Sequence, residues 1–268
     1  MSRPFFATAI AAVCLVLALG AGAARADDAL ERIIETRTLI VGMSGDQPPM
    51  NALNREGNVM GLDVDLARAL ASAMRVSLQV EQMPFGELME ALEEGDVDLV
   101  ISGMAITPER AEDALFAGPY MLSGKSILTR SDVVARFASG DLAEQETRLA
   151  ALSDSTSATF VREAAPNAEL VEVDDYASAV TMIQAGDVAG LVADMPACVL
   201  AVMRHPDADL VTLDEPLTVE PLGIAVSEDE PELHSLVSNY LAAYEGTGMV
   251  QALRVKWLEN SGWIAALP

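Results

Sequence analysis

Two hydrophobic periods alternate along the first half of the chain. The run TLIVGM, residues 38–43, is apolar throughout and predicts a buried strand. In the next segment Leu62, Leu66 and Leu70 recur every four residues after Gly61, which predicts a helix. The elements expected here are strands at 38–43, 76–80 and 97–101 and helices at 62–74 and 85–94. This βαβαβ order predicts a parallel sheet with right-handed crossovers.

The same alternation restarts in the second half of the chain. The expected elements are strands at 126–129, 149–152, 170–173, 190–193 and 222–226, and helices at 155–165, 176–185, 232–245 and 249–260. A helix-Gly-Asp-strand pattern occurs as LEEGDVDLV at 92–100 and again as IQAGDVAGLV at 183–192. The repeat predicts two lobes of one α/β architecture. Ligands of such sheets bind beyond the carboxyl ends of the strands, so the site is expected between the lobes.

The N-terminus has the three regions of a secretory signal. Arg3 is followed by an apolar run at 5–19, and Ala24-Arg25-Ala26 fits the small-x-small cleavage rule. The apolar run is shorter than the roughly 20 residues that a membrane span needs. Cys14 lies inside this run, which argues against lipidation. Residues 1–26 are therefore expected to be removed on export, leaving a mature periplasmic protein that begins at Asp27.

Charge and cysteine content exclude several functions. The chain has 41 acidic and 16 basic residues and a formal net charge of −25, so it should repel nucleic acid. Cys198 is the only cysteine after cleavage, so an intramolecular disulfide is impossible, and we expect a buried, inert thiol. The two histidines, His205 and His234, do not have the spacing of metal ligands. We therefore expect no metal and no cofactor.

An ordered set of motifs then gives a resemblance. The segments are GLDVDLARALA at 61–71, DVDLVISGM at 96–104, ITPER at 106–110, GPY at 118–120, SGK at 123–125 and KWL at 256–258. In this order they resemble the amino-acid-type periplasmic solute-binding proteins, the family 3 receptors of ABC importers. The resemblance implies a type II fold of two lobes, each with a mostly parallel βα-layered sheet, joined by two hinge strands. Lobe 1 would comprise 27–125 and 220–268, and lobe 2 would comprise 126–219.

The resemblance also implies a ligand and partners. The ligand would be a small zwitterion, typically an amino acid, and the partner an inner-membrane ABC permease served by a monomeric receptor. Arg110 would hold the ligand carboxylate, because a guanidinium forms a planar fork with a carboxylate. Thr107 and Pro108 are suited to starting a helix there, whose amides would assist. Asp194 would hold the ammonium. Without the motif, Arg110 would be taken for a surface charge and Asp194 for a helix cap.

Further positions follow from the same resemblance. Thr156 corresponds to a hydroxyl position at the carboxylate, and Phe85 to an aromatic wall; the alternatives are a helix-start residue and a core residue. Gly103 and Ala105 would border the ligand, although Ala105 replaces a common Ser or Thr. Gln47 stands where many members carry an aromatic residue. Two further departures are Ser44, which replaces the acid of receptors for basic amino acids, and Asp154, which replaces a common glycine.

Two other functions share this pattern. Cyclohexadienyl dehydratases have the same fold and a similar C-terminal segment, but similar enzymes carry a glutamate where this chain has Ala197. Because the reaction needs a general acid, we expect no enzyme here. A receptor that presents its ligand to a membrane sensor would have the same sequence features as a transport receptor. Genome neighbourhood would separate these last two.

Overall fold

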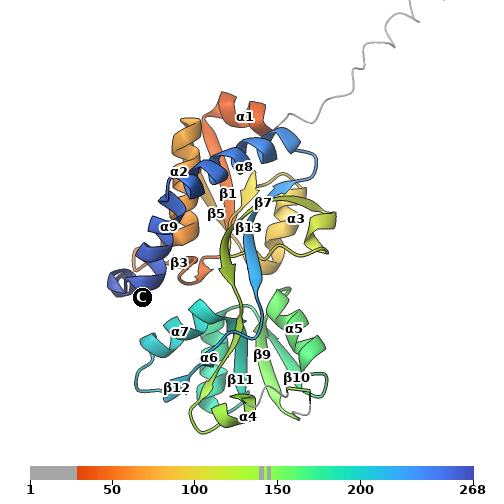
Figure 1. Ribbon diagram of the computed structural model, residues 1–268, viewed down its shortest axis with the longest axis vertical. Coiled ribbons are helices and arrows are strands. Elements are labelled where there is room, and N and C mark those ends of the chain that lie inside the picture. The colour runs from red at the N-terminus through yellow and green to blue at the C-terminus, as the bar shows by residue number, and fades with distance from the viewer. Residues whose placement is uncertain (1–28, 139–141, 144–145) are drawn as a thin grey trace, which may run out of the picture.

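The computed structural model of the chain describes residues 29–138, 142–143 and 146–268, and within these it consists of two lobes. The expected signal at 1–26 lies outside the described residues. Figure 1 shows the two lobes one above the other, connected by long strands. Each lobe has its own five-stranded sheet, with helices packed on its faces.

Lobe 1 is built on a sheet with the order β5-β1-β6-β13-β7. The strands are β1 (Thr38–Met43), β5 (Ser77–Gln82), β6 (Leu99–Val100), β7 (Ala114–Ser123) and β13 (Glu220–Ser227). The helices are α1 (Ala29–Thr36), α2 (Leu62–Met74), α3 (Leu88–Glu93), α8 (Pro231–Gly246) and α9 (Met249–Arg254). A small second sheet contains β2 (Asp46–Gln47), β3 (Asn51–Leu53) and β4 (Val59–Met60). β1 runs parallel to β5 and β6, whereas β13 runs antiparallel to its neighbours.

Lobe 2 repeats this plan with the order β10-β9-β11-β8-β12. The strands are β8 (Lys125–Arg130), β9 (Arg148–Leu152), β10 (Glu169–Val173), β11 (Gly190–Asp194) and β12 (Leu210–Val211). The helices are α4 (Val134–Ala138), α5 (Thr156–Ala164), α6 (Tyr176–Ala185) and α7 (Met195–Arg204). β9 runs parallel to β10 and β11, and β8 is antiparallel to β11.

The chain crosses between the lobes at two adjacent points. β7 leads through Gly124 into β8, and the segment before β13 returns beside it, where Glu220 is paired with Ser123. The amide of Lys125 donates to Thr218 Oγ1 at 2.9 Å. A Cβ on Gly124 would lie 2.1 Å from the carbonyl oxygen of Thr218, so only glycine permits this close approach.

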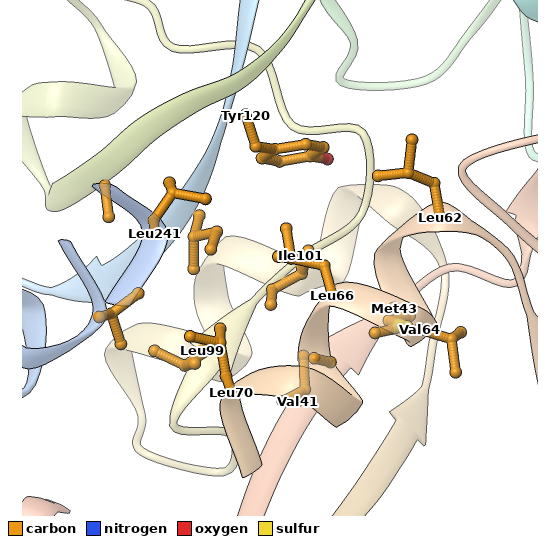
Figure 2. Packing of buried hydrophobic residues seen from close by; sticks show 14 of the residues in the cluster. Val41, Met43, Leu62, Val64, Leu66, Leu70, Leu99, Ile101, Tyr120 and Leu241 are labelled. Carbon is orange, nitrogen blue, oxygen red and sulfur yellow. The ribbon is translucent and has the colours of Figure 1, made fainter. Parts of the chain in front are cut away.

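The core of lobe 1 lies between α2 and the sheet (Figure 2). Leu62, Leu66 and Leu70 are completely buried and pack with Leu99 and Ile101 of the sheet region. This is the four-residue spacing read from the sequence, now seen as one face of a helix. Each of these side chains contributes on the order of 2 kcal/mol through burial of apolar surface. The rigid core fixes the loops that follow β1 and β6, which carry the candidate site.

Some elements differ from the expected ones. The helix expected at 85–94 is a 3₁₀ turn, Phe85–Glu87, followed by α3, and the helix expected at 249–260 ends in a π-helical turn, Val255–Glu259. β7 is not among the strands expected from the sequence, and it contains Pro119, which is unfavourable inside a strand. The strand exists because it lies at the edge of its sheet, where a missing N–H donor is tolerated. Cys198 is buried as expected, and burial raises the pKa of its thiol to about 12.

Candidate functional site

The seven residues predicted to contact the ligand all border one cavity between the lobes. They are Gln47, Phe85, Gly103, Ala105 and Arg110 from lobe 1 and Thr156 and Asp194 from lobe 2. The other residues at this cavity are Lys125, Leu152, Ser155, Ser157 and Tyr176. The cavity leaves about 20 Å³ for solvent, which is room for about one water molecule. The lobes must therefore part before an amino acid can enter.

Arg110 is held at the lobe 1 side of the cavity. Its amide donates to Thr107 Oγ1 at 3.2 Å, and its guanidinium donates to the carbonyls of Ala105 and Asp154 at 3.1 and 3.2 Å. The bond to Asp154 crosses from lobe 1 to lobe 2. The expected helix start is only a 3₁₀ turn, Arg110–Glu112, so no α-helix adds its dipole on this side. Burial lowers the pKa of Arg110, but an arginine remains charged at neutral pH.

A helix start does border the cavity from lobe 2. Ser155 caps α5, its hydroxyl accepting a hydrogen bond from the amide of Ala158 at 3.3 Å. Thr156 and Ser157 form the first turn and line the cavity. The unpaired amides of a first turn favour an anion. The Thr156 hydroxyl donates to Glu220 Oε2 at 2.8 Å, so in this structure it binds a protein carboxylate.

Asp194 belongs to a cluster of charges that sequence analysis did not identify. Lys125 Nζ lies 2.6 Å from Asp194 Oδ1 and 2.9 Å from Glu220 Oε2. Thr218 Oγ1 donates to the other oxygen of Glu220 at 3.0 Å. Asp194 makes no capping bond to α7, and among the described residues no donor is bonded to its Oδ2. This oxygen can therefore accept a hydrogen bond from a ligand ammonium.

A buried polar network fixes the floor of the cavity. The amide of Gly103 and the side chain of Asn51 both donate to Asp63 Oδ2 at 2.9 Å, and Tyr120 donates to Oδ1 at 2.8 Å. Burial raises the pKa of Asp63 to about 6, so the carboxylate is ionised at neutral pH and holds these donors in place. Gly103 has a φ of +57°, and a Cβ there would lie 3.2 Å from Gln47 Oε1.

Two aromatic side chains border the cavity. The Arg110 guanidinium carbon lies 5.5 Å from the centre of the Phe85 ring, a distance typical of a cation–π contact. Tyr176, the first residue of α6, lies at the cavity from lobe 2, and burial raises its pKa well above 10. Gln47 supplies no ring, as expected, but Tyr176 provides a second aromatic group from the other lobe. Its position directly after the strand β10 and the cap Asp175 is the signal that could have identified it.

Replacing Phe85 with leucine is expected to weaken ligand binding by about threefold to tenfold. Phe85 is 7% exposed and packs with Leu88 and Leu152, so alanine would also open a cavity in the core. Leucine keeps most of the apolar volume but removes the ring, and a cation–π contact contributes about 0.5–2 kcal/mol. Calorimetric titration would measure the change. The matched control is Phe137→Leu in lobe 2, at a phenylalanine 1% exposed; unchanged affinity in both variants would make Phe85 a core residue only.

Two larger cavities flank the site. One, of about 800 Å³, shares Ala105, Arg110, Ser155 and Thr156 with it as lining residues. The other, of about 360 Å³, lies on the far side of Tyr176 and is bordered by Ala197. Ala197 is therefore not at the cavity that holds Arg110 and Asp194. In the described residues no group of three or more potential metal ligands was found, and no helix there is long and apolar enough to cross a bilayer.

Comparison with known proteins identifies the family. The model of the bacterial extracellular solute-binding proteins, family 3, matches residues 39–260. The ABC transporter arginine-binding protein 1 of Escherichia coli K12 is 28% identical over 81% of this chain and 88% of its own length. The cyclohexadienyl dehydratase of Pseudomonas aeruginosa is 26% identical over 97% of both chains.

A solved structure has the same fold. It is that of an ancestral amino acid-binding protein, described as a precursor of cyclohexadienyl dehydratase. The identity is 31%, the match covers 86% of this chain and 99% of the other, and the TM-score is 0.79. The two-lobed fold expected from the sequence is thereby confirmed.

Proposed function

Because the chain belongs to the bacterial extracellular solute-binding proteins of family 3, we propose that it binds an amino acid between its lobes for delivery to an ABC importer. The observation that carries this proposal is the single cavity bordered by Arg110 from lobe 1 and Asp194 from lobe 2. A guanidinium complements a carboxylate, and a carboxylate complements an ammonium. The two residues are thus suited to the two ends of a zwitterion.

Binding would proceed by closure of the lobes. The site residues are divided between the lobes, and the enclosed volume is too small for an amino acid to enter without opening. In the open form the ligand carboxylate would meet Arg110 and the apolar part would meet Phe85. Closing would then bring Asp194, Tyr176 and the first turn of α5 onto the ligand. Closure around a ligand is a general mode of periplasmic binding proteins, by which binding is signalled to a partner.

The working location follows from the same proposal. Members of this family are extracellular or periplasmic, and residues 1–26 have the features of a cleavable signal. We propose that the mature protein acts in the periplasm as a monomer, with an inner-membrane ABC permease as its partner. No cofactor takes part in the proposed binding.

One of the relatives is a cyclohexadienyl dehydratase, so the acids near this cavity must be compared with those that a dehydratase needs. A dehydratase needs a general acid beside its substrate, and Ala197 has no acidic group. Two buried or half-buried acids near the cavity already have protein partners. Asp63 accepts from Asn51, Gly103 and Tyr120, and both oxygens of Glu220 accept from Lys125, Thr156 or Thr218. Glu220 therefore has a structural role in this cluster, as the acceptor of these hydrogen bonds. We therefore propose a binding protein and not an enzyme.

Ligand screening would test the function. Mature protein beginning at Asp27 should show a raised thermal midpoint with at least one of the twenty common amino acids, because a ligand that binds only the folded state stabilises it. The same protein incubated with prephenate or arogenate should form no phenylpyruvate or phenylalanine above background. Stabilisation by none of the amino acids would contradict the receptor, and turnover of either substrate would establish the enzyme.

A further inference from the structure

Lys125 is a buried cation at the ligand cavity. It is 3% exposed, and lysine is almost never so buried unless it is paired. Its Nζ lies between two carboxylates, 2.6 Å from Asp194 Oδ1 and 2.9 Å from Glu220 Oε2. The space between these two carboxylates is therefore occupied by a cation of the protein itself.

The backbone fixes Lys125 in this position. It begins β8 and lies opposite Asp194 in the register of β8 with β11. Its amide donates to Thr218 Oγ1 at 2.9 Å, and its carbonyl accepts from the amide of Leu217 at 2.7 Å. Both crossings between the lobes thus hold the residue. These backbone contacts hold Lys125 beside the site in this structure.

Four charged groups at the site balance one another. A fifth, the buried carboxylate of Asp63 beneath Gly103, is already bonded to three protein donors and is not available to a ligand. Arg110 and Lys125 carry positive charges, and Asp194 and Glu220 carry negative charges. Lys125 and Glu220 form an internal ion pair, which leaves Arg110 and Asp194 to bind opposite charges of a ligand. An amino acid with an uncharged side chain also carries one positive and one negative charge, and its net charge is zero. A ligand with a net charge would place one uncompensated charge in the closed site, which is unfavourable.

Other charged side chains lie outside this enclosed site. The larger cavity toward solvent is bordered by Glu109, Asp113, Asp154, Arg162 and Glu163, and Arg110 and Glu220 also border it. The cavity beyond Tyr176 is bordered by Asp46, Asp175, Arg204 and His205. Water and salt screen charges that face such open cavities. On the lobe 1 side, Ser44 is bonded to the side chain of Asn51 and offers no acid to a cationic side chain.

We propose that Lys125 determines the class of ligand. By pairing with Glu220 it leaves one positive and one negative group, Arg110 and Asp194, for the ligand, so that the site selects amino acids with uncharged side chains and excludes arginine and lysine. This inference rests on the proposed function, because it assumes that an amino acid is the ligand. It makes Lys125 a specificity-determining residue whose effect is electrostatic.

Titration of the wild-type protein with the twenty common amino acids would give the first test. The tightest ligand should have an uncharged side chain, and arginine, lysine, aspartate and glutamate should each bind at least tenfold more weakly. Tightest binding of arginine or lysine would overturn this proposal and leave the receptor function intact. Binding of none of the twenty would instead contradict the receptor function itself.

Three variants test the role of charge directly. Lys125→Met removes the cation but keeps an unbranched apolar stem. It should change the ratio of neutral to cationic affinities by at least tenfold in favour of arginine and lysine. Glu220→Gln should change the preference by a similar factor toward aspartate and glutamate. The double variant Lys125→Met/Glu220→Gln removes one positive and one negative charge, so the charge balance of the wild type returns. It should therefore restore the preference for the neutral ligand.

The double variant separates charge from damage to the site. A cavity or a misplaced strand would persist or worsen in it, whereas a charge effect is reversed. Thermal unfolding of each variant without ligand would establish that it is folded. If Lys125→Met does not fold, Glu220→Gln and the double variant still test whether charge determines the ligand preference. Affinity ratios within threefold of the wild type in every folded single variant would overturn the proposal.

Discussion

Arg110→Ala is expected to weaken amino acid binding by about two to three orders of magnitude. In the closed site the ligand carboxylate would be left buried without its guanidinium, at a cost of roughly 3–5 kcal/mol, and about 1.4 kcal/mol corresponds to tenfold in affinity. Isothermal titration with the tightest amino acid found in the screen would measure the loss. The stability of the unliganded protein should change little, because the guanidinium bonds only two backbone carbonyls among the described residues.

Analogues and a conservative variant sharpen this test. Wild-type protein should prefer the free carboxylate over the ligand amide, and Arg110→Ala should lose that preference. Arg110→Lys keeps the charge but not the planar fork, so it should recover only part of the affinity. If Arg110→Ala binds the parent ligand within threefold of wild type, Arg110 is not the carboxylate ligand and the zwitterion site is wrong.

Asp194→Ala should produce a loss of binding of the same order but with a different pattern. The variant should lose the preference for a free ligand amine over the acetylated amine, because Asp194 Oδ2 would no longer accept from the ammonium. It should also destabilise the unliganded protein by about 1–3 kcal/mol. Lys125 would lose one of its two partners while remaining buried, with Glu220 still at 2.9 Å.

A matched control is available in the same lobe. Asp214 is exposed, so Asp214→Ala removes one negative charge without touching the cavity. Urea unfolding and titration of both variants would separate a local effect from a change in net charge. If Asp194→Ala were as stable as wild type and retained full preference for the free amine, the paired arrangement of Asp194 and Lys125 would have no role in binding.

Local signals predicted much of the fold. The helix expected at 176–185 has those bounds in the structure, because Asp175 caps its start and Gly186, with a φ of +81°, ends it. α2 likewise begins and ends at the expected residues, because the spacing of its leucines is unbroken. In each case the determinants are contiguous in sequence. The seven predicted ligand residues border one cavity, although their contacts with a ligand stay a prediction.

Features that depend on distant parts of the chain were missed. Lys125 lies in the segment SGK, but its role depends on Glu220, which a different crossing strand brings to it. Tyr176 was read as an ordinary helix start, and only the approach of the two lobes places it opposite Phe85. Thr156 was assigned to a ligand carboxylate, yet its hydroxyl reaches Glu220. No periodicity in a single sequence records which residues meet across such an interface.

The closeness of the two crossing strands at Gly124 has a consequence for how this protein can change. Lys125 and Glu220 belong one to each strand, at the point where the chain crosses between the lobes, and in the proposed site the same two side chains contribute to the charge beside the ligand. We therefore expect the same two residues to affect both the choice of ligand and the opening of the lobes. We expect a substitution here that admits a new ligand also to alter the rate at which the lobes separate, so selection for a new nutrient and selection for fast release would act on the same two positions.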